Sequence, residues 1–483
     1  MKVYSLRMKM RIGGHDCSSA DDRWIPVINP ATGAEIDQVP GGTVYEVDDA
    51  VRAAEDAFDG WSKKTVRERG AVFSHAALAI RENHHELARQ LTCEQGKPIR
   101  ESTDEVRGFA NILEYYAGIA AGIRGDLLNL GQSGDCLVTR EPLGVCGAII
   151  PWNMPVLIMG WKISPALLAG NTLVFKPASE TPLTNLMIAR LMEASGLPPG
   201  VLNVVTGRGD PVGEAIARHP AIKKVSFTGD ALTGDRVREL ATSSLKEVVL
   251  ELGGSDPMIV MSDADIDAAV SGAIRGRFYN AGQTCTAVKR LYVHEPVASV
   301  FIEKLAARAG SLKTGNGMDS SVDMGPLAGR EQKKRITDLV ETIDRKGEGT
   351  IITGGVSPEG PEYEKGFYFS PTIVTEPHPD SALLSQEVFG PVLPVIRVPD
   401  LDAAIMHANS TRYGLGASVW THDTRVIKEV FSRVNAGIVW VNRHLTVPPE
   451  VPFGGVKASG IGRENGIEAY NSYSRTKSLF LGW

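Results

Sequence analysis

Three polar side chains in this sequence stand where an α/β fold could use them for chemistry. Cys285 lies in the segment 280–286, in which glycine and other small residues would let a substrate approach the sulfur closely. Glu251 ends a predicted strand and precedes two glycines, and active sites of α/β proteins form at the carboxyl ends of parallel strands. Asn153 lies between two prolines, which restrict the backbone and could hold an amide donor in place. Each residue alone also fits a structural role, such as a buried thiol or an amide in a turn.

The elements that must position these residues follow from an alternation of short apolar runs and helical periods. The region 47–119 has apolar residues at helical spacing and is predicted to be helical. Beyond it, runs rich in β-branched residues alternate with helical stretches, which predicts βαβ units and a parallel sheet. The predicted strands are 145–150, 172–175, 202–205, 224–227 and 247–250, and the predicted helices are 164–170, 183–196, 211–218 and 232–242.

The alternation restarts after Gly253 and Gly254, which predicts a second α/β domain. The glycine-rich stretch 122–134 and the alternating residues 136–139 predict a β excursion. The expected fold class is α/β, with two Rossmann-like parallel-sheet domains and a small β element. The second domain is predicted to contain a helix at 266–279 and strands at 290–293, 350–353, 392–398, 417–421 and 437–441.

Composition excludes several classes of protein. The 483 residues suffice for several cores without disulfides, and we expect no metal site. The 51 Lys and Arg against 57 Asp and Glu residues give a net charge of -6, which argues against nucleic-acid or membrane binding. Five scattered cysteines and no evident signal peptide favour a cytoplasmic protein. The apolar run 144–161 contains Pro151, Asn153 and Pro155, which favours buried structure over a membrane span.

Glycine patterns typical of nucleotide sites are incomplete. After Gly207 and Gly209 the next glycine, Gly213, comes one residue too late for Gly-x-Gly-x-x-Gly. The segment 227–234 follows a predicted strand and opens a helix, but it lacks the Lys and Ser/Thr of an ATP-binding P-loop. Its N–H groups could face a phosphate, or the segment could be a plain turn capped by Asp230.

Seven ordered motifs resemble the aldehyde dehydrogenase superfamily over nearly the whole chain. Their order and spacing match the family, and chance similarity over seven motifs is negligible. The family also lacks the usual dinucleotide fingerprint, in agreement with its absence here. The motifs are PWNMP at 151–155, FKPASE at 175–180, FTG at 227–229, ELGG at 251–254, GQTC at 282–285, EVFGP at 387–391 and PFGG at 452–455.

The resemblance implies NAD(P)-dependent oxidation of an aldehyde to a carboxylic acid. Cys285 would attack the carbonyl as a thiolate, and the oxyanion would be held by the Asn153 amide and the Cys285 backbone N–H. After hydride transfer, Glu251 would activate the water that hydrolyses the thioester. Lys162 and Glu464 match family positions implicated in relaying that proton.

The same resemblance implies a cofactor site for NAD or NADP. Lys176 would bind the adenine-side ribose and Glu387 the nicotinamide-side ribose, with Phe389 beside the nicotinamide. Ser179 stands where many NAD-preferring members have a glutamate that repels a 2′-phosphate, but Glu180 could restore negative charge, so both cofactors remain open. Asp230 replaces a common serine near the pyrophosphate and should point away as a helix cap. The remaining expected cofactor residues are Ile150, Pro151, Trp152, Gly209, Thr228, Gly229 and Leu252.

By family position, the substrate tunnel has an apolar lining, which suits an aromatic or medium aliphatic aldehyde. Succinate semialdehyde is disfavoured because Trp161 and Tyr279 replace arginines, although Arg443 could substitute as the cation. Lactaldehyde and glyceraldehyde remain alternatives, and only part of an aromatic cage for betaine aldehyde is evident. The expected lining residues are Met154, Ile158, Trp161, Thr284, Thr286, His444 and Phe453.

Three rival functions fit the sequence less well. An acylating dehydrogenase that transfers the acyl group to coenzyme A commonly lacks the general base that Glu251 would provide. A non-catalytic cofactor-binding protein could use the same fold, but Cys285, Glu251 and Asn153 are all present. A Cys–His hydrolase is disfavoured because no histidine stands in a recognisable partner motif.

The resemblance also predicts domains and a homodimer or homotetramer. Residues 1–123 and 142–252 would form the NAD(P)-binding domain, 253–455 the catalytic domain, and 124–141 with 456–483 an oligomerisation element. The tail ends in Leu479, Phe480 and Leu481, an apolar edge that would be exposed unless another subunit covers it.

Overall fold

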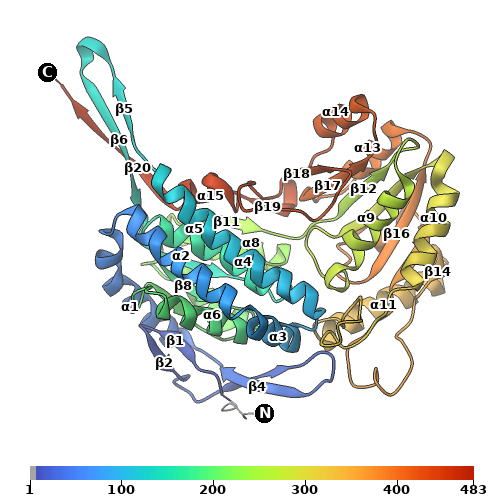
Figure 1. Cartoon of the computed structure of the whole chain (residues 1–483), viewed down its shortest axis with the longest axis horizontal. Coiled ribbons are helices and arrows are strands. Elements are labelled where there is room, and N and C mark those ends of the chain that lie inside the picture. Colours follow the sequence, from blue (N-terminus) through green and yellow to red (C-terminus); the bar gives the residue numbers. More distant parts are fainter. Residues whose placement is uncertain (1–6, 483) are drawn as a thin grey trace.

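A computed structural model describes residues 7–482, which form two large β-sheets with helices on both faces (Figure 1). The first half of the chain builds one lobe and most of the second half builds the other. A narrow antiparallel arm projects from the first lobe, and the C-terminal strand runs along it. Four hydrophobic clusters fill the spaces between sheets and helices, which places a packed layer on each face of each sheet.

The first sheet has the strand order β19-β11-β10-β7-β8-β9-β1-β2. Strands β7 to β11 run parallel, and the edges are closed by antiparallel β1 with β2 and by β19. The central strands β7, β8 and β10 are buried along their length, as continuous apolar runs predict for a sheet covered on both faces. The bounds are β1 (Met10–Ile12), β2 (His15–Cys17), β7 (Val145–Ile149), β8 (Thr172–Lys176), β9 (Leu202–Val204), β10 (Lys224–Thr228), β11 (Glu247–Glu251) and β19 (Gly460–Ile461).

Helices cover this sheet unequally. On one face α5 and α6 contact the strands and carry a second helical layer of α2, α3 and α4, while α1, α7 and α8 cover the other face. Capping boxes start α1 at Thr43 and α2 at Thr65, and Asp230 caps α8, as predicted. The bounds are α1 (Val44–Ser62), α2 (Val66–Glu82), α3 (His84–Gln95), α4 (Ile99–Ile119), α5 (Pro155–Leu168), α6 (Leu183–Ala194), α7 (Glu214–Arg218) and α8 (Ala231–Ala241).

The second sheet has the order β14-β15-β16-β13-β12-β17-β18, parallel except for β14. Helices α9 to α11 pack in the cluster on one face, and α13 and α14 pack in the cluster on the other. The strands are β12 (Asp256–Val260), β13 (Val288–His294), β14 (Thr350–Thr353), β15 (Thr372–Thr375), β16 (Val392–Val398), β17 (Gly416–Trp420) and β18 (Ile438–Val441). The helices are α9 (Ile266–Phe278), α10 (Glu295–Gly310), α11 (Arg330–Lys346), α12 (Ala382–Ser385), α13 (Leu401–Asn409), α14 (Thr424–Arg433) and α15 (Gly466–Ser472), of which α15 lies beside α5.

Two smaller antiparallel sheets complete the fold. The arm pairs β6 (Asp135–Pro142) with β5 (Asp126–Asn129) and with β20 (Ser474–Leu481), so the chain end is tied to residues more than 300 positions earlier. A hairpin of β3 (Trp24–Ile28) and β4 (Glu35–Pro40) lies at the base of the first lobe. The arm therefore depends on a long-range pairing that its local sequence alone does not specify.

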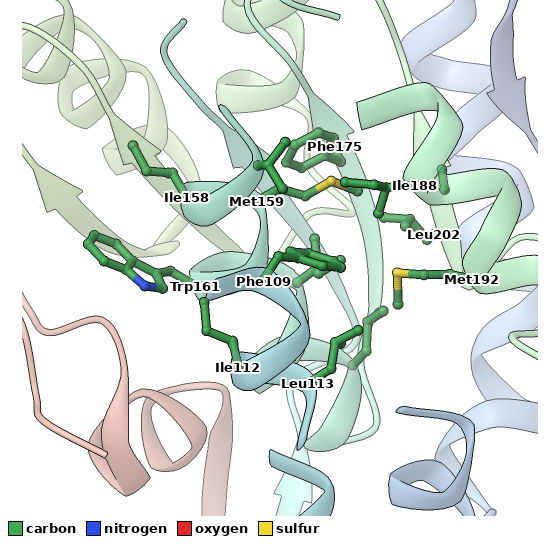
Figure 2. Packing of buried hydrophobic residues seen from close by; sticks show 14 of the residues in the cluster. Phe109, Ile112, Leu113, Ile158, Met159, Trp161, Phe175, Ile188, Met192 and Leu202 are labelled. Carbon is green, nitrogen blue, oxygen red and sulfur yellow. The ribbon is translucent and has the colours of Figure 1, made fainter. Parts of the chain in front are cut away.

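The core of the first lobe fixes α5, the helix that follows Asn153. Phe109 from α4, Phe175 from β8 and Ile188 from α6 surround Met159 of α5 (Figure 2). Trp161 leaves α5 on the side away from Ile188. Burying each such side chain contributes about 1.5–3 kcal/mol, so α5 is firmly held while its other side presents Trp161.

The predicted fold class is confirmed, with differences in individual elements. Helix α5 begins at Pro155 rather than at residue 164, because Pro155 takes the first helical position, where its missing N–H is no loss. The segment 211–218 forms a helix only from Glu214 onward, after an irregular turn of π type over 209–213. Strands β12 and β15 were not foreseen from the sequence, which also gave no bounds for helices α10, α11, α13 and α14. Among the described residues, no helix is both long and apolar enough to cross a membrane.

Candidate functional site

A strained turn precedes Cys285. The segment η5 (Tyr279–Gly282) follows α9, and Asn280, Ala281 and Gly282 have φ angles of 52°, 53° and 74°. A Cβ on Gly282 would lie 2.3 Å from a backbone oxygen of Gly390, so glycine is required there. The turn leaves Cys285 partly exposed among buried neighbours. Left-handed backbone at residues other than glycine needs support from outside, and the neighbouring helices supply it.

That support comes through Asn280. Its side-chain oxygen accepts a hydrogen bond from Gln95 Nε2 at 2.9 Å, and its backbone N–H donates to Glu101 at 2.8 Å. Its Nδ2 donates to the backbone carbonyl of Asn153 at 2.8 Å. Residues of α3 and α4 therefore hold the turn before Cys285 and join it to the segment that carries Asn153.

Asn153 stands against the Cys285 segment. Its side chain is 3% exposed, and its Nδ2 donates to the backbone carbonyl of Gln283 at 3.0 Å. Its own carbonyl accepts from the Lys97 ammonium at 2.8 Å. Lys97 pairs with Glu105, which also accepts the N–H groups of the first turn of α5, and both side chains are fully buried. A buried ion pair thus fixes the backbone around Asn153.

Glu251 is a buried acid without a partner. It is 3% exposed, and within residues 7–482 neither carboxylate oxygen has a hydrogen-bond partner. Burial, reinforced by the charge of Glu464, raises the pKa of Glu251 well above its ordinary value, while Lys162 opposes the shift. A Cβ on Gly454 would lie 2.7 Å from Glu251 Oε1, so the glycine leaves room for the carboxyl group. Such an acid is suited to binding a water or passing a proton.

Lys162, Ser226 and Glu464 form a hydrogen-bonded network whose charges act on Glu251. The side chains of Lys162 and Glu464 are 2.8 Å apart, and the Ser226 hydroxyl lies 2.8 Å from each of them. All three are buried. The structure therefore brings together two of the predicted catalytic residues, and adds a hydroxyl that the sequence did not indicate.

Glu387 and Phe389 are linked to the Cys285 segment by Lys289. The Lys289 ammonium donates to the Cys285 carbonyl at 2.6 Å and to Glu387 at 2.9 Å, and it lies 5.6 Å from the Phe389 ring centre. Trp152 packs edge-on against the same ring at 5.6 Å between centres. A Cβ on Gly253 would lie 1.9 Å from the Glu387 carboxylate, so this glycine makes room for it. Four predicted residues thus cluster around one unforeseen lysine.

The surroundings of the Cys285 thiol disfavour its ionised form, the thiolate. Burial raises its pKa to about 12, and the carboxyl groups of Asp256, Glu251 and Glu387 push in the same direction. Lys289 is the cation that opposes them. Thiolate formation here requires help from the neighbouring groups or from a bound ligand.

A cleft of about 780 Å³ opens at the other end of the predicted cofactor site. It is lined by Ile150, Lys176, Ser179 and Gly209, four of the predicted cofactor residues. Ile25 and Phe367 add apolar walls, and Arg208, Glu180 and Arg330 add charge. Lys176 is buried and its pKa is lowered to about 8 by burial, while the Ser179 hydroxyl donates to the Gly207 carbonyl at 2.9 Å. The mixture of apolar walls and cations fits the adenosine and phosphate of a nucleotide.

Thr228, Gly229 and Leu252 lie beside the strand end that carries Glu251. Thr228 pairs with Glu251 across the sheet, and the Gly229 N–H donates to the Glu251 carbonyl at 3.0 Å. The Leu252 N–H donates to the Ser459 carbonyl at 2.9 Å. Pro151 precedes Trp152 in the same loop and is partly buried. Asp230 accepts from the Thr233 N–H at 3.0 Å, so it caps α8 as expected.

The predicted substrate residues fall into two groups. Met154, Ile158, Trp161 and Phe453 belong to one hydrophobic cluster against which Cys285 packs, with the Trp161 and Phe453 ring centres 5.0 Å apart. Thr284 precedes Cys285 and is buried, with a side-chain oxygen that has no partner within the described chain. The first group therefore gives an apolar surface beside the sulfur.

His444 and Thr286 form the second group. The His444 Nε2 lies 2.7 Å from the Thr286 carbonyl, so this nitrogen carries the proton, and Nδ1 then accepts from the Ser418 hydroxyl at 2.9 Å. Burial lowers the pKa of His444 to about 4, which keeps the ring neutral. With both nitrogens engaged, His444 anchors the segment that follows Cys285.

Several site residues escaped the sequence analysis. Lys97, Lys289 and Asn280 make the hydrogen bonds that hold the site, and Arg208 and Arg330 line the cleft. Asn280 and Lys289 lie close to Cys285 in sequence, which was an available signal. Nothing local distinguishes Lys97 or Arg330 from solvent-exposed cations, because their roles depend on partners far along the chain.

The chain is similar in sequence to known proteins over nearly its whole length. The sequence profile of the Aldehyde dehydrogenase family matches residues 17–479. The chain is 40% identical to a phenylacetaldehyde dehydrogenase of Pseudomonas fluorescens, covering 98% of this chain and 96% of that protein. It is 39% identical to a betaine aldehyde dehydrogenase of Brucella anthropi, covering 97% and 96%.

Solved structures agree with these matches. An aldehyde dehydrogenase structure from Burkholderia cenocepacia superposes with a TM-score of 0.97 at 39% identity, covering 99% of this chain and 98% of that one. An NADP dependent enzyme of E. coli gives 0.96 at 36% identity, covering 99% and 98%. A betaine aldehyde dehydrogenase of Staphylococcus aureus in complex with NAD+ gives 0.96 at 34% identity, covering 99% and 96%.

Proposed function

The chain belongs to the aldehyde dehydrogenase family and is an NAD(P)-dependent oxidoreductase, and we propose that it oxidises an aromatic or medium aliphatic aldehyde to the carboxylic acid. The observation that carries the proposal is the buried, unpartnered carboxyl group of Glu251 near the Cys285 segment. The apolar cluster of Met154, Trp161 and Phe453 beside Cys285 supports the substrate class.

The first half of the reaction uses Cys285 and Asn153. The Cys285 thiolate adds to the carbonyl carbon, and the π electrons move to the carbonyl oxygen, which becomes an oxyanion. The Asn153 amide has two N–H groups and gives one to Gln283, so the second can donate to the oxyanion together with the Cys285 backbone N–H. When bound, NAD(P)+ supplies the acceptor for the hydride that leaves the thiohemiacetal carbon, and a thioester on Cys285 remains.

The second half uses Glu251. A water attacks the thioester carbon while Glu251 takes one proton from that water. The bond between the acyl carbon and the Cys285 sulfur then breaks, which releases the carboxylic acid and restores the Cys285 thiolate. The raised pKa of Glu251 makes its carboxylate a stronger base than an exposed glutamate. Lys162, Ser226 and Glu464 are hydrogen-bonded to one another, and the charges of Lys162 and Glu464 act on Glu251, so these are the groups that would receive this proton from Glu251.

We propose that the cleft accepts NADP as well as NAD. Among its lining residues, Lys176, Arg208 and Arg330 are cationic, and Glu180 is the single carboxylate. Ser179 adds no negative charge where a 2′-phosphate would approach Lys176. The variant Ser179→Glu should raise the NADP KM by roughly tenfold or more, because a carboxylate beside the 2′-phosphate is repelled by it, with little change for NAD. Ser179→Ala serves as the matched neutral control.

Between the substrates of the two named relatives, the apolar surface favours the phenylacetaldehyde type. A quaternary ammonium group needs several aromatic faces around it. The cluster against which Cys285 packs combines the paired rings of Trp161 and Phe453 with the aliphatic side chains of Met154 and Ile158.

The test is a panel of aldehydes, each with NAD and with NADP, followed by the absorbance of the reduced cofactor. Benzaldehyde, phenylacetaldehyde and hexanal should give the highest kcat/KM, above lactaldehyde, glyceraldehyde, betaine aldehyde and succinate semialdehyde. Cys285→Ser should abolish turnover while leaving cofactor affinity intact. Strong preference for succinate semialdehyde, or acyl-CoA formation when coenzyme A is supplied, would overturn the assignment.

We further propose that the arm joins subunits into a homodimer or homotetramer. Leu127, Leu128, Leu137, Leu479 and Phe480 are each between 38% and 68% exposed along β5, β6 and β20. The arm stands clear of the first lobe, so nothing within the described chain covers this surface (Figure 1). An apolar strand edge of this kind is typically covered by a second subunit. Strands β5, β6 and β20 fall within the predicted oligomerisation element, whereas β19 and α15, which lie in the same predicted segment, pack in the first lobe.

A further inference from the structure

The buried Lys289 side chain makes polar contacts that packing alone does not require. It lies in β13 just after the Cys285 loop, and its side chain is fully buried. Its ammonium donates to the carbonyls of Thr284 at 3.1 Å and Cys285 at 2.6 Å, and to the Glu387 carboxylate at 2.9 Å. These three acceptors use all three N–H groups of the ammonium.

The neighbouring Arg290 offers an instructive contrast. Its guanidinium is also buried, and it donates to the backbone carbonyls of Ser255, His407 and Ala408, which ties loops of the second lobe together. Lys289 instead points its charge at the nucleophile's own carbonyl and at a cofactor-site carboxylate. A buried cation is expensive to desolvate, so its retention beside Cys285 calls for a role that uses the charge.

The charges around Cys285 show what that role is. Asp256, Glu251 and Glu387 all disfavour a negative charge on the sulfur, and Lys289 is the cation that favours it. Replacing Lys289 by a neutral residue would leave three carboxyl groups around a sulfur that must become an anion. The same replacement would release the Cys285 carbonyl, and with it the backbone that aims the thiol.

We propose that Lys289 is a positioning residue that holds the Cys285 backbone in place and lends its positive charge to the thiolate. This role rests on the nucleophilic role proposed for Cys285. The Lys289 ammonium binds both the Cys285 carbonyl and the Glu387 carboxylate. A shift of the Glu387 carboxylate would therefore reach Cys285 through this one side chain.

The experiment measures alkylation of Cys285 by iodoacetamide in the cofactor-free protein as a function of pH, with the modified cysteine identified by mass spectrometry. Lys289→Met should shift the alkylation profile to higher pH by about one unit, so that the rate at pH 8 falls about tenfold. Lys289→Arg keeps the charge and should retain most of the rate. Lys246→Met is the matched control, because Lys246 is also buried and donates to a backbone carbonyl, that of Ala217 at 2.8 Å, away from the site.

The outcomes separate this inference from the proposed function. An alkylation profile of Lys289→Met that matches wild type, or a shift no larger than in Lys246→Met, would overturn the role of Lys289. If Lys289→Met does not fold, Lys289→Gln is measured instead, and an unshifted profile there refutes the proposal equally. If Cys285→Ser still oxidises aldehydes, the nucleophile assignment itself is wrong, whatever the Lys289 variants do.

Discussion

The buried pair of Lys97 and Glu105 allows a quantitative test of how the site is held. Replacing Lys97 by Met removes the cation but leaves the Glu105 carboxylate in a place with no exposed surface. Breaking a buried pair in this way costs about 3–5 kcal/mol, because the remaining carboxylate loses its paired cation and is left with two backbone N–H donors of α5. The Asn153 carbonyl also loses one of two donors and keeps the Asn280 amide, which adds about 1 kcal/mol to the cost. We therefore expect Lys97→Met to lower the free energy of unfolding by about 4–6 kcal/mol.

The measurement is urea unfolding followed by tryptophan fluorescence, with kcat measured on the folded fraction. The double variant Lys97→Met with Glu105→Gln should recover about 2 kcal/mol or more relative to the sum of the single variants, because the stranded charge is gone. Lys334→Met is the surface control: its ion pair with Asp338 is largely exposed, so its unfolding curve should match wild type.

Two results would refute the reasoning about this pair. One is a loss below about 1 kcal/mol for Lys97→Met, which would mean that water reaches Glu105. The other is strict additivity of the two substitutions. A stable Lys97→Met variant with unchanged kcat would also show that Asn153 is held without this lysine.

Three further predictions concern other parts of the molecule. Glu251→Gln should lower steady-state kcat about 10²–10⁴-fold while a stoichiometric burst of reduced cofactor persists in rapid-mixing experiments; loss of the burst would place Glu251 before hydride transfer. Burial raises the pKa of Asp256 from 3.8 to about 7, so the folded state keeps a proton that the unfolded chain loses, and this contribution to stability is lost as pH rises from about 4 to about 7. Asp256→Asn should flatten that slope in chemical denaturation, and an unchanged slope would assign it to other groups. Phe480→Lys should shift light-scattering mass toward the monomer, whereas unchanged mass would place the subunit interface elsewhere.

The amino-acid sequence determined the features that are encoded locally. Continuous apolar runs identified most of the buried parallel strands, because a strand covered on both faces is apolar along its length. Helical spacing identified helices of the first lobe and α9, because a helix buried on one face repeats its apolar residues at that spacing. Strands β12 and β15 and helices α10, α11, α13 and α14 were not located from the sequence. The motifs around Cys285, Glu251 and Asn153 predicted the family, which the comparisons confirm. Asp230 was predicted as a cap because capping needs only the next turn of the same helix.

Only the tertiary structure decided which distant groups meet. Lys97 and Lys289 look like ordinary surface lysines in the sequence, and they become site residues because Glu105, Asn153 and Glu387 arrive from other elements. The walls of the cleft, the network whose charges act on Glu251 and the pairing of β20 with β6 have the same origin. Periodicity reports how deeply a residue is buried, whereas the identity of its partner depends on the order of strands in a sheet and on which helices cross it. That order is a property of the folded chain.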